Sequence, residues 1–217
     1  MPRPLRSDFA GAFHHVMNRG VARADIFCAD PIRDLFLTVA AEAAHKYALE
    51  VHGYCLMTNH YHLLLRSLDG RLTDGMRHLS SCFTQTINYR RGRDGPLFRG
   101  RFASVRIGDD AHLVQASRYI HLNPVTAGIA HRAQDWTWSS AAAYVGASAQ
   151  PRWLTTGFIL GLFDGSGRAR EKYRAFLDEG IDSKTRQFYI DARMAAGELG
   201  SDPNARPSKN RHSGHGV

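Results

Sequence analysis

The chain has 217 residues, of which 43% are hydrophobic and 10% aromatic, and it carries a net charge of +8. This composition is typical of a globular protein and excludes an intrinsically disordered chain, and the length can bury one well-cored domain with an appendage or two small domains. No apolar run approaches the roughly 18 residues that a membrane-spanning helix needs, so no membrane segment is expected.

The N-terminal residues and the cysteines favour a cytoplasmic protein. The first residues, MPRPLRSDFAGAF, include basic side chains but no apolar stretch of the kind found in a secretory signal. Cys28, Cys55 and Cys82 are odd in number and unevenly spaced, which argues against a disulfide framework and against CxxC zinc sites. Reduced cysteines in the core are what a cytoplasmic protein contains.

Positive charge is concentrated in one part of the chain. Between Arg66 and Arg106 there are nine arginines and three aspartates. A bias in genome composition would produce the same excess of arginine. A guanidinium is, however, also well suited to binding a phosphate, to which it can donate two hydrogen bonds at once. The local excess therefore predicts a track for a polyanion.

The first half of the chain predicts a strand, a helix and a hairpin. Residues 12–21 predict a short strand that ends in an Asn-Arg-Gly turn. Residues 29–50 predict a helix with Asp30 as N-cap and Pro31 at the first helical position. Two further strands, 51–57 and 60–66, flank Thr58-Asn59 as a hairpin.

The following segments complete one domain. Residues 72–92 have helical spacing, 96–107 predict a strand with arginines among aromatics, and 109–123 predict a helix that Asp109 or Asp110 caps and that stops before Pro124. The resulting order is the ferredoxin-like split βαβ arrangement, an α+β fold with an antiparallel sheet and helices on one face.

Three regions are expected along the chain. The core domain covers residues 8–145, and a linker, GASAQPR, then opens a helical C-terminal extension over 146–196 that contains two short helices. Residues 197–217 predict a disordered basic tail.

Two histidines lie two positions apart in the strand at 60–66. Residues i and i+2 of an extended chain point to the same side of a sheet, so His60 and His62 lie side by side while Tyr61 points away. The apolar residues that follow indicate a strand covered on both faces, where a polar ring needs a partner. A divalent metal ion is one such partner, and ordinary hydrogen bonds are another.

The last helix of the core adds a phenol and an amide. Tyr119 and Asn123 are i and i+4 on that helix and therefore share a side. If this side packs over the histidine strand, Mg²⁺ or Mn²⁺ would accept the mixed nitrogen and oxygen ligands and keep positions open for substrate oxygens. The structural alternatives are a packing role for Tyr119 and a C-terminal helix cap for Asn123.

Five blocks of sequence, in order, resemble a known family over roughly residues 9–145. They are HHVMNRGVARADIF, HGYCLMTNHYHLLLR, GPLFRGRFASVRI, RYIHLNPVTAGIA and DWTWSSAAAYVG. The chain is similar to the single-tyrosine HUH transposases of the IS200/IS605 type, and particularly to their REP-associated branch. Proline is usual in the family where Thr58 stands, and arginine is frequent where Thr126 stands, but neither position supplies a catalytic group.

The resemblance implies a site and a reaction. His60 and His62 would be the ligands of a divalent metal, Mg²⁺ or Mn²⁺, and Asn123 would take the place of an amide-type third ligand. Tyr119 would be the nucleophile that forms a 5′-phosphotyrosine bond with single-stranded DNA and frees a 3′-OH. The sequence leaves open whether a homodimer exchanges Tyr119 between subunits or a monomer acts alone.

Arginines that neutralise phosphates and aromatic rings that stack on unpaired bases are the expected DNA contacts. Phe98 and Phe102 are the candidates for stacking, although strand alternation would equally place them in the core. Asn18 and Arg19 are candidates for holding a DNA hairpin, whereas Gly20 indicates a structural turn. The candidate arginines are Arg90, Arg91, Arg93, Arg99, Arg101 and Arg106.

Two other functions fit the same residues. One is a domesticated module that binds hairpin DNA or RNA without turnover, and the other is a metal phosphodiesterase in which water attacks. Only a tyrosine nucleophile predicts a covalent protein–DNA adduct that Tyr119→Phe abolishes. The chain has no GxxxxGK[ST] loop, so no nucleotide cofactor is expected.

Overall fold

The sheet at the centre of the protein has four antiparallel strands in the order β2-β3-β1-β4. The computed structural model describes residues 8–163 and 167–195, with the side chains of residues 193 and 195 left aside. The strands are β1 (Ala12–Arg19), β2 (Leu49–Leu56), β3 (His60–Ser67) and β4 (Ala103–Arg106).

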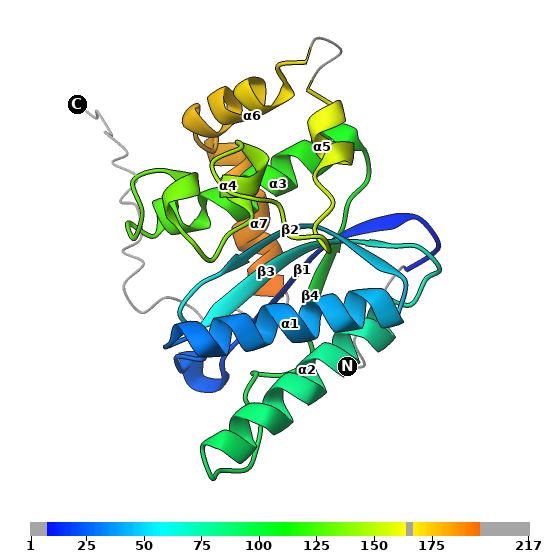
Figure 1. The fold of residues 1–217 in the computed structure, drawn as a ribbon, viewed down its shortest axis with the longest axis vertical. Helices are drawn as coiled ribbons and strands as arrows, with labels where there is room; N and C mark the ends of the chain where they lie inside the picture. Colours follow the sequence, from blue (N-terminus) through cyan, green and yellow to red (C-terminus); the bar gives the residue numbers. More distant parts are fainter. Residues whose placement is uncertain (1–7, 164–166, 196–217) are drawn as a thin grey trace, which may run out of the picture.

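Two crossover helices make the sheet a pair of interleaved split βαβ units. Helix α1 (Asp30–Lys46) connects β1 to β2, and α2 (Leu72–Arg90) connects β3 to β4. Because β3 lies between β1 and β2, and β1 lies between β3 and β4, each unit encloses a strand of the other. Both helices cover the same face of the sheet (Figure 1). The expected ferredoxin-like core is therefore confirmed.

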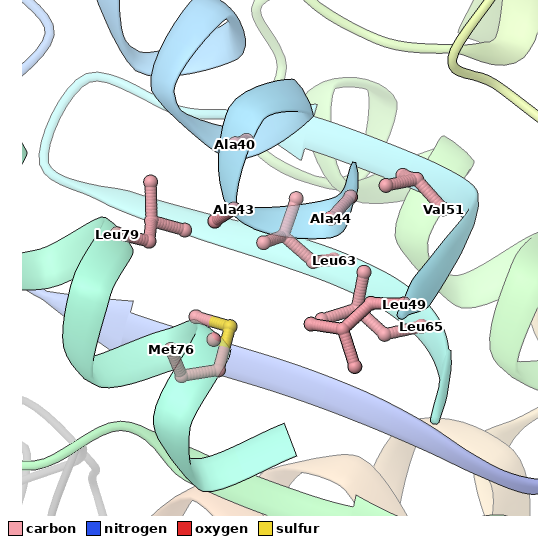
Figure 2. A pocket seen from close by; sticks show the side chains of 10 residues that line it. Ala40, Ala43, Ala44, Leu49, Val51, Leu63, Leu65, Met76 and Leu79 are labelled. Carbon is pink, nitrogen blue, oxygen red and sulfur yellow. The ribbon is translucent and has the colours of Figure 1, made fainter. Parts of the chain in front are cut away.

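A continuous apolar core lies between these two helices and the sheet. Phe36 from α1, Phe83 from α2 and Leu63 from β3 are all at most 2% exposed. Side chains from α1, α2, β2 and β3 line a small cavity of about 10 Å³. Figure 2 shows these side chains. The lining is apolar, so the cavity is expected to stay dry. Gly75 allows the close approach of α2 to the sheet, because a Cβ there would lie 2.6 Å from Leu49 Cδ1.

The opposite face of the sheet is covered by the remaining helices (Figure 1). The long helix of this layer, α3 (Asp110–Thr126), contacts both β2 and β3. The shorter elements of the described chain are η1 (Val21–Arg23), η2 (Ala133–Asp135), α4 (Ala141–Tyr144), α5 (Gly157–Gly161), α6 (Ala169–Asp178) and α7 (Ser183–Ala195). The helical extension thus contains α7 in addition to the two short helices expected. The tail expected at 197–217 lies outside the described residues.

Helix α3 runs through Pro124 and does not stop before it. Proline removes one backbone hydrogen bond, but Pro124 is in the last turn, where little helix remains to be disrupted. The helix then ends at Gly128 in the left-handed conformation, with Ile129 N donating to Pro124 O and Gly128 N to Val125 O. This pair of bonds is a Schellman motif. At the other end, Asp109 is the N-cap and accepts a bond from His112 N, as expected.

Two other expected boundaries were wrong. Asp30 is the first residue of α1 and not its cap, and its carboxylate pairs with Arg33. The strand expected over 96–107 is limited to Ala103–Arg106, because the chain before it turns to pair with the end of β1. In that turn, Val21 N donates to Leu97 O and Arg99 N donates to Arg19 O.

Candidate active site

His60 and His62 lie at the start of β3, on the face that α3 covers. Their ring centroids are 5.2 Å apart and the rings are nearly perpendicular. His62 is fully buried, whereas His60, the first residue of the strand, is half-buried. The strand alternation that predicted a shared side is confirmed.

Helix α3 brings Tyr119 over the histidines. Its apolar residues Leu113, Ala116 and Ile120 pack in the same cluster as Leu64 of β3, which fixes the helix on the sheet. The Tyr119 ring lies 5.8 Å from the ring of His62 and meets it edge-on, and the tyrosine is 6% exposed. Tertiary packing therefore places the phenol beside the histidine pair.

Asn123 follows one turn later on α3, on the side of Tyr119. Its Nδ2 donates to the backbone oxygen of Tyr119 over 2.7 Å, and the residue is 9% exposed. The side chain does not project freely from a helix end, because the helix continues through Pro124. The hydrogen bond uses the amide nitrogen and leaves the amide oxygen as the group able to bind a cation.

A third histidine, His15 on β1, belongs to the same cluster, and sequence reasoning missed it. Its Nε2 lies 2.9 Å from Nδ1 of His62, and its ring lies 5.7 Å from that of Tyr119. The signal was present in the pair His14-His15, but its meaning depends on the pairing of β1 with β3.

Hydrogen bonds on the Nδ1 side orient both imidazoles of β3. His60 Nδ1 lies 2.8 Å from Asn59 Oδ1, and an amide oxygen can only accept, so His60 carries its proton on Nδ1. His62 Nδ1 is bonded in turn to His15. Both rings are therefore held through Nδ1, which is the usual arrangement of histidines that bind a metal through Nε2. No group of three or more His, Cys, Asp and Glu ligands occurs among the described residues, so a metal here would also need the amide oxygen or substrate oxygens.

Helix α7 contributes a second tyrosine to the site. The ring of Tyr189 stacks on that of Tyr119 with centroids 4.2 Å apart, and it lies 5.1 Å from the ring of His15. Tyr189 is 1% exposed, and burial, with a smaller effect from Tyr119, raises the pKa of its phenol. The extension of the chain thus covers the candidate nucleophile.

A buried polar network links α3 to α6 and to the sheet. His121 Nδ1 lies 2.6 Å from the hydroxyl of Tyr173 on α6, and its Nε2 lies 2.7 Å from Ser140 Oγ. Ser140 in turn accepts from Tyr54 N on β2. Burial lowers the pKa of His121 to about 3, so this ring is neutral. The network joins α3, α6 and the sheet around the turn that carries Tyr119.

The structure divides the expected DNA contacts into two groups. Phe98 and Phe102 are 6% and 5% exposed and belong to the core, so neither ring is available to stack on a base. Asn18 is 2% exposed and donates to Gly100 O, which makes it a support for the loop carrying Arg99 and Arg101. The candidate arginines that are exposed are Arg90, Arg91, Arg93, Arg99, Arg101 and Arg106.

The residues at the end of β1 also have structural roles. Arg19 is 9% exposed, and its backbone oxygen accepts from Arg99 N. Gly20 is part of a turn, as expected, and a Cβ there would lie 2.2 Å from Ala24 O. These residues hold the arginine loop beside the start of β3, where Arg19 is in register with His60.

A sheet that carries a histidine pair, covered by a helix that carries a tyrosine, is the arrangement that the resemblance to single-tyrosine transposases implied. The family model described as "Transposase IS200 like" matches residues 10–123, and the chain belongs to this family. None of the described helices is long and apolar enough to cross a membrane.

Two similar proteins carry names of the REP-associated branch, which the sequence blocks also resemble. A protein of Haemophilus influenzae, provisionally named a REP-associated tyrosine transposase, is 26% identical over 116 residues, which are 48% of this chain and 66% of the relative. The chain thus spans slightly less than two thirds of that relative. A solved structure of a REP-associated tyrosine transposase bound to a REP hairpin shares the fold, with a TM-score of 0.59 and 16% identity over 71% of this chain and 92% of the other.

Proposed function

We propose that the protein is a metal-dependent strand transferase that cleaves and rejoins single-stranded DNA beside REP-like hairpins. The observation that carries this proposal is the packing of the Tyr119 ring against His62, next to His60. A phenol beside two neighbouring imidazoles is the arrangement needed for a tyrosine to attack a bound phosphate.

The donor atoms fit a divalent ion such as Mg²⁺ or Mn²⁺. His60 and His62 would bind it through Nε2, since Nδ1 of each ring is already hydrogen-bonded, and Asn123 would bind through its amide oxygen. Such an ion, when bound, reduces the negative charge of the phosphate that is attacked. The chain supplies the remaining parts of the reaction itself.

In the proposed reaction, Tyr119 is the nucleophile. Its hydroxyl oxygen forms a bond to phosphorus and loses its proton, while the bond from phosphorus to the 3′ oxygen breaks and that oxygen leaves as a 3′-OH. The product is a 5′-phosphotyrosine. A 3′-OH of DNA then attacks the same phosphorus, and the phenol leaves and regains a proton. Burial of Tyr119 against His62 holds the attacking oxygen in one place, which favours attack along a single line.

Hairpin DNA as the substrate is supported by two observations. The related solved structure is of a transposase bound to a REP hairpin. In addition, Arg99 and Arg101 are exposed on a loop that the backbone of Arg19 ties to the strand ends at the site. Phosphates that flank a cleaved position would meet these arginines.

A denaturing gel tests the proposal. Labelled single-stranded hairpins from the flanks of the protein's own gene are incubated with the full chain and Mn²⁺ or Mg²⁺. We expect a covalent protein–DNA adduct that is absent with EDTA and absent in Tyr119→Phe. An adduct that survives Tyr119→Phe would exclude this nucleophile.

Replacing a histidine should separate cleavage from binding. We expect His60→Ala to abolish the adduct and to leave the affinity for the hairpin nearly unchanged, because phosphate contacts lie elsewhere. Equal losses of adduct and of affinity, measured by fluorescence anisotropy, would contradict this division.

One observation favours a second function, hairpin binding without turnover. Tyr119 is 6% exposed and its ring is stacked on that of Tyr189, so little of the side chain is open to a substrate in the arrangement seen. A module that only binds would show tight hairpin binding and no adduct with either metal.

A further inference from the structure

The end of helix α2 and the loop after it form an exposed projection that the site described above does not include. This α2 tip consists of residues 88–96. Ile87, at 1% exposure, is the last residue of α2 in the core, and of the tip's residues all but Asn88, which is half-buried, are exposed. Figure 1 shows this end of α2 extending away from the sheet.

The α2 tip is held in a defined shape. Asn88 Nδ2 donates to Gly95 O over 2.8 Å, and Arg93 N donates to Asn88 O over 3.0 Å. Gly92 and Gly95 have positive φ angles of 56° and 87°, which glycine adopts readily and which close the loop. The side chains of the tip are therefore presented on an ordered backbone.

Tyr89 is the unusual residue of the tip. It is 89% exposed, whereas six of the other seven tyrosines are buried and Tyr47 is half-buried. Within the described part of the chain, no other ring and no cation packs against it. An aromatic ring left in water loses the free energy that burial of its apolar surface would provide, which suggests a partner outside the chain.

The charges around Tyr89 indicate the chemistry of that partner. Arg90, Arg91 and Arg93 are exposed on the same short segment, with Asp94 as its one acidic residue. An aromatic face among guanidinium groups fits a single strand of nucleic acid, since the ring stacks on an unpaired base and the arginines neutralise the phosphates beside it. A protein partner would require a complementary acidic surface to match the arginines.

The α2 tip is at the same end of the sheet as the candidate active site. Helix α2 runs antiparallel to β3, so it ends near the start of β3 where His60 lies. The loop that follows the tip returns through Arg99, whose backbone binds that of Arg19 opposite His60. A DNA strand in the site would thus continue past Arg101 and Arg99 toward the tip.

We propose that Tyr89 is a base-stacking residue, which holds an unpaired base of the DNA substrate while Arg90, Arg91 and Arg93 bind the adjoining phosphates. The proposal rests on the proposed function for the identity of the DNA, and it assigns the stacking role to Tyr89 in place of the buried Phe98 and Phe102.

Fluorescence of 2-aminopurine tests the stacking directly. The fluorophore is placed, one position at a time, in the loop and in the single-stranded flanks of the gene-flanking hairpin, and the full chain is added in EDTA so that no cleavage occurs. We expect quenching at one unpaired position, lost in Tyr89→Ala and kept in Tyr89→Phe. Tyr89→Ala should bind the hairpin about tenfold more weakly.

The control is Arg77→Ala, an exposed residue at the other end of α2 that pairs with Asp74 and should leave quenching and affinity unchanged. The proposal would be overturned if Tyr89→Ala kept both the quenching and the affinity of the wild type. It would also be overturned if Tyr89→Phe lost the quenching to the same extent as Tyr89→Ala. The metal-dependent adduct is measured separately. If the wild type forms no adduct, the proposed transferase activity is contradicted but the stacking is not. If Tyr89→Ala leaves the quenching unaltered, the proposed stacking is contradicted but the transferase activity is not.

Discussion

At the scale of single residues, His15 determines how His62 can act. A histidine that binds a cation through Nε2 must keep its proton on Nδ1, and that proton needs an acceptor. His15 Nε2 is in the position to accept it, 2.9 Å away. His15 is therefore a positioning residue for the proposed ligand and not a ligand itself.

We expect His15→Ala to raise the Mn²⁺ concentration needed for half-maximal adduct formation by about 10- to 100-fold, as is typical when the partner of a metal-binding histidine is removed. His15→Gln supplies an amide oxygen as the acceptor in place of the imidazole nitrogen and should recover part of the loss. A titration of adduct yield against Mn²⁺ measures both. An unchanged midpoint in His15→Ala would show that His62 is oriented by something else.

His121 gives the protein a predictable response to acid. The unfolded chain binds a proton at His121 with the ordinary pKa near 6.5, but the folded chain does so only near pH 3 because the ring is buried. Between these values the unfolded state holds more protons, so the free energy of unfolding decreases as the pH falls, by up to about 1.4 kcal/mol per unit. Above pH 6.5 this contribution is complete.

Comparison with His121→Gln isolates this effect from that of the other histidines. We expect the variant to be less stable at pH 7. Between pH 6.5 and pH 4.5 its free energy of unfolding should decrease less steeply with falling pH than that of the wild type, by the slope that one bound proton contributes. Urea unfolding at several pH values measures it. Parallel curves for the two proteins would mean that His121 titrates normally in the fold.

At the scale of elements, α7 packs against the candidate nucleophile. The ring of Tyr189 stacks on that of Tyr119, and we expect this stack to limit the approach of a phosphate. An aromatic pair contributes about 0.5–1.5 kcal/mol beyond its buried area. Removing the ring should therefore increase the open population about two- to tenfold.

We expect Tyr189→Ala to form the covalent adduct about two- to tenfold faster than the wild type in single-turnover gels. Met194→Ala, an exposed position on the same helix, serves as the control and should match the wild type. Slower adduct formation in Tyr189→Ala would instead identify Tyr189 as a support that the nucleophile needs.

At the scale of the whole molecule, the exposed Arg99 and Arg101 lie at the end of the sheet where DNA is proposed to bind. We expect Arg99→Ala combined with Arg101→Ala to weaken hairpin binding and to reduce the slope of log affinity against log salt by about two at most. Exposed Arg152 and Arg186, both in the extension, provide a control pair with the same loss of charge. An unchanged slope in the first pair would remove that loop from the interface.

Local patterns in the sequence determined much of the fold. The helical spacing of α1 and α2, the hairpin at Thr58-Asn59 and the Asp109 cap were all predicted, because each depends on residues close in the chain. The side shared by His60 and His62 follows in the same way from strand geometry. The blocks that resemble the family implied the same fold and added the expected site and reaction.

Contacts between distant segments were decided only by the tertiary structure. Phe98 and Phe102 could not be assigned to core or surface, because alternation in a strand at 96–107 buries one face without showing which one. Packing against Phe83 buries Phe98. His15 and Tyr189 join the site from β1 and α7 through strand pairing and helix docking, which no local pattern records. The sequence by itself therefore determined the elements and the histidine pair, whereas the enclosure of Tyr119 depended on side chains far apart in the chain that meet only when the protein folds.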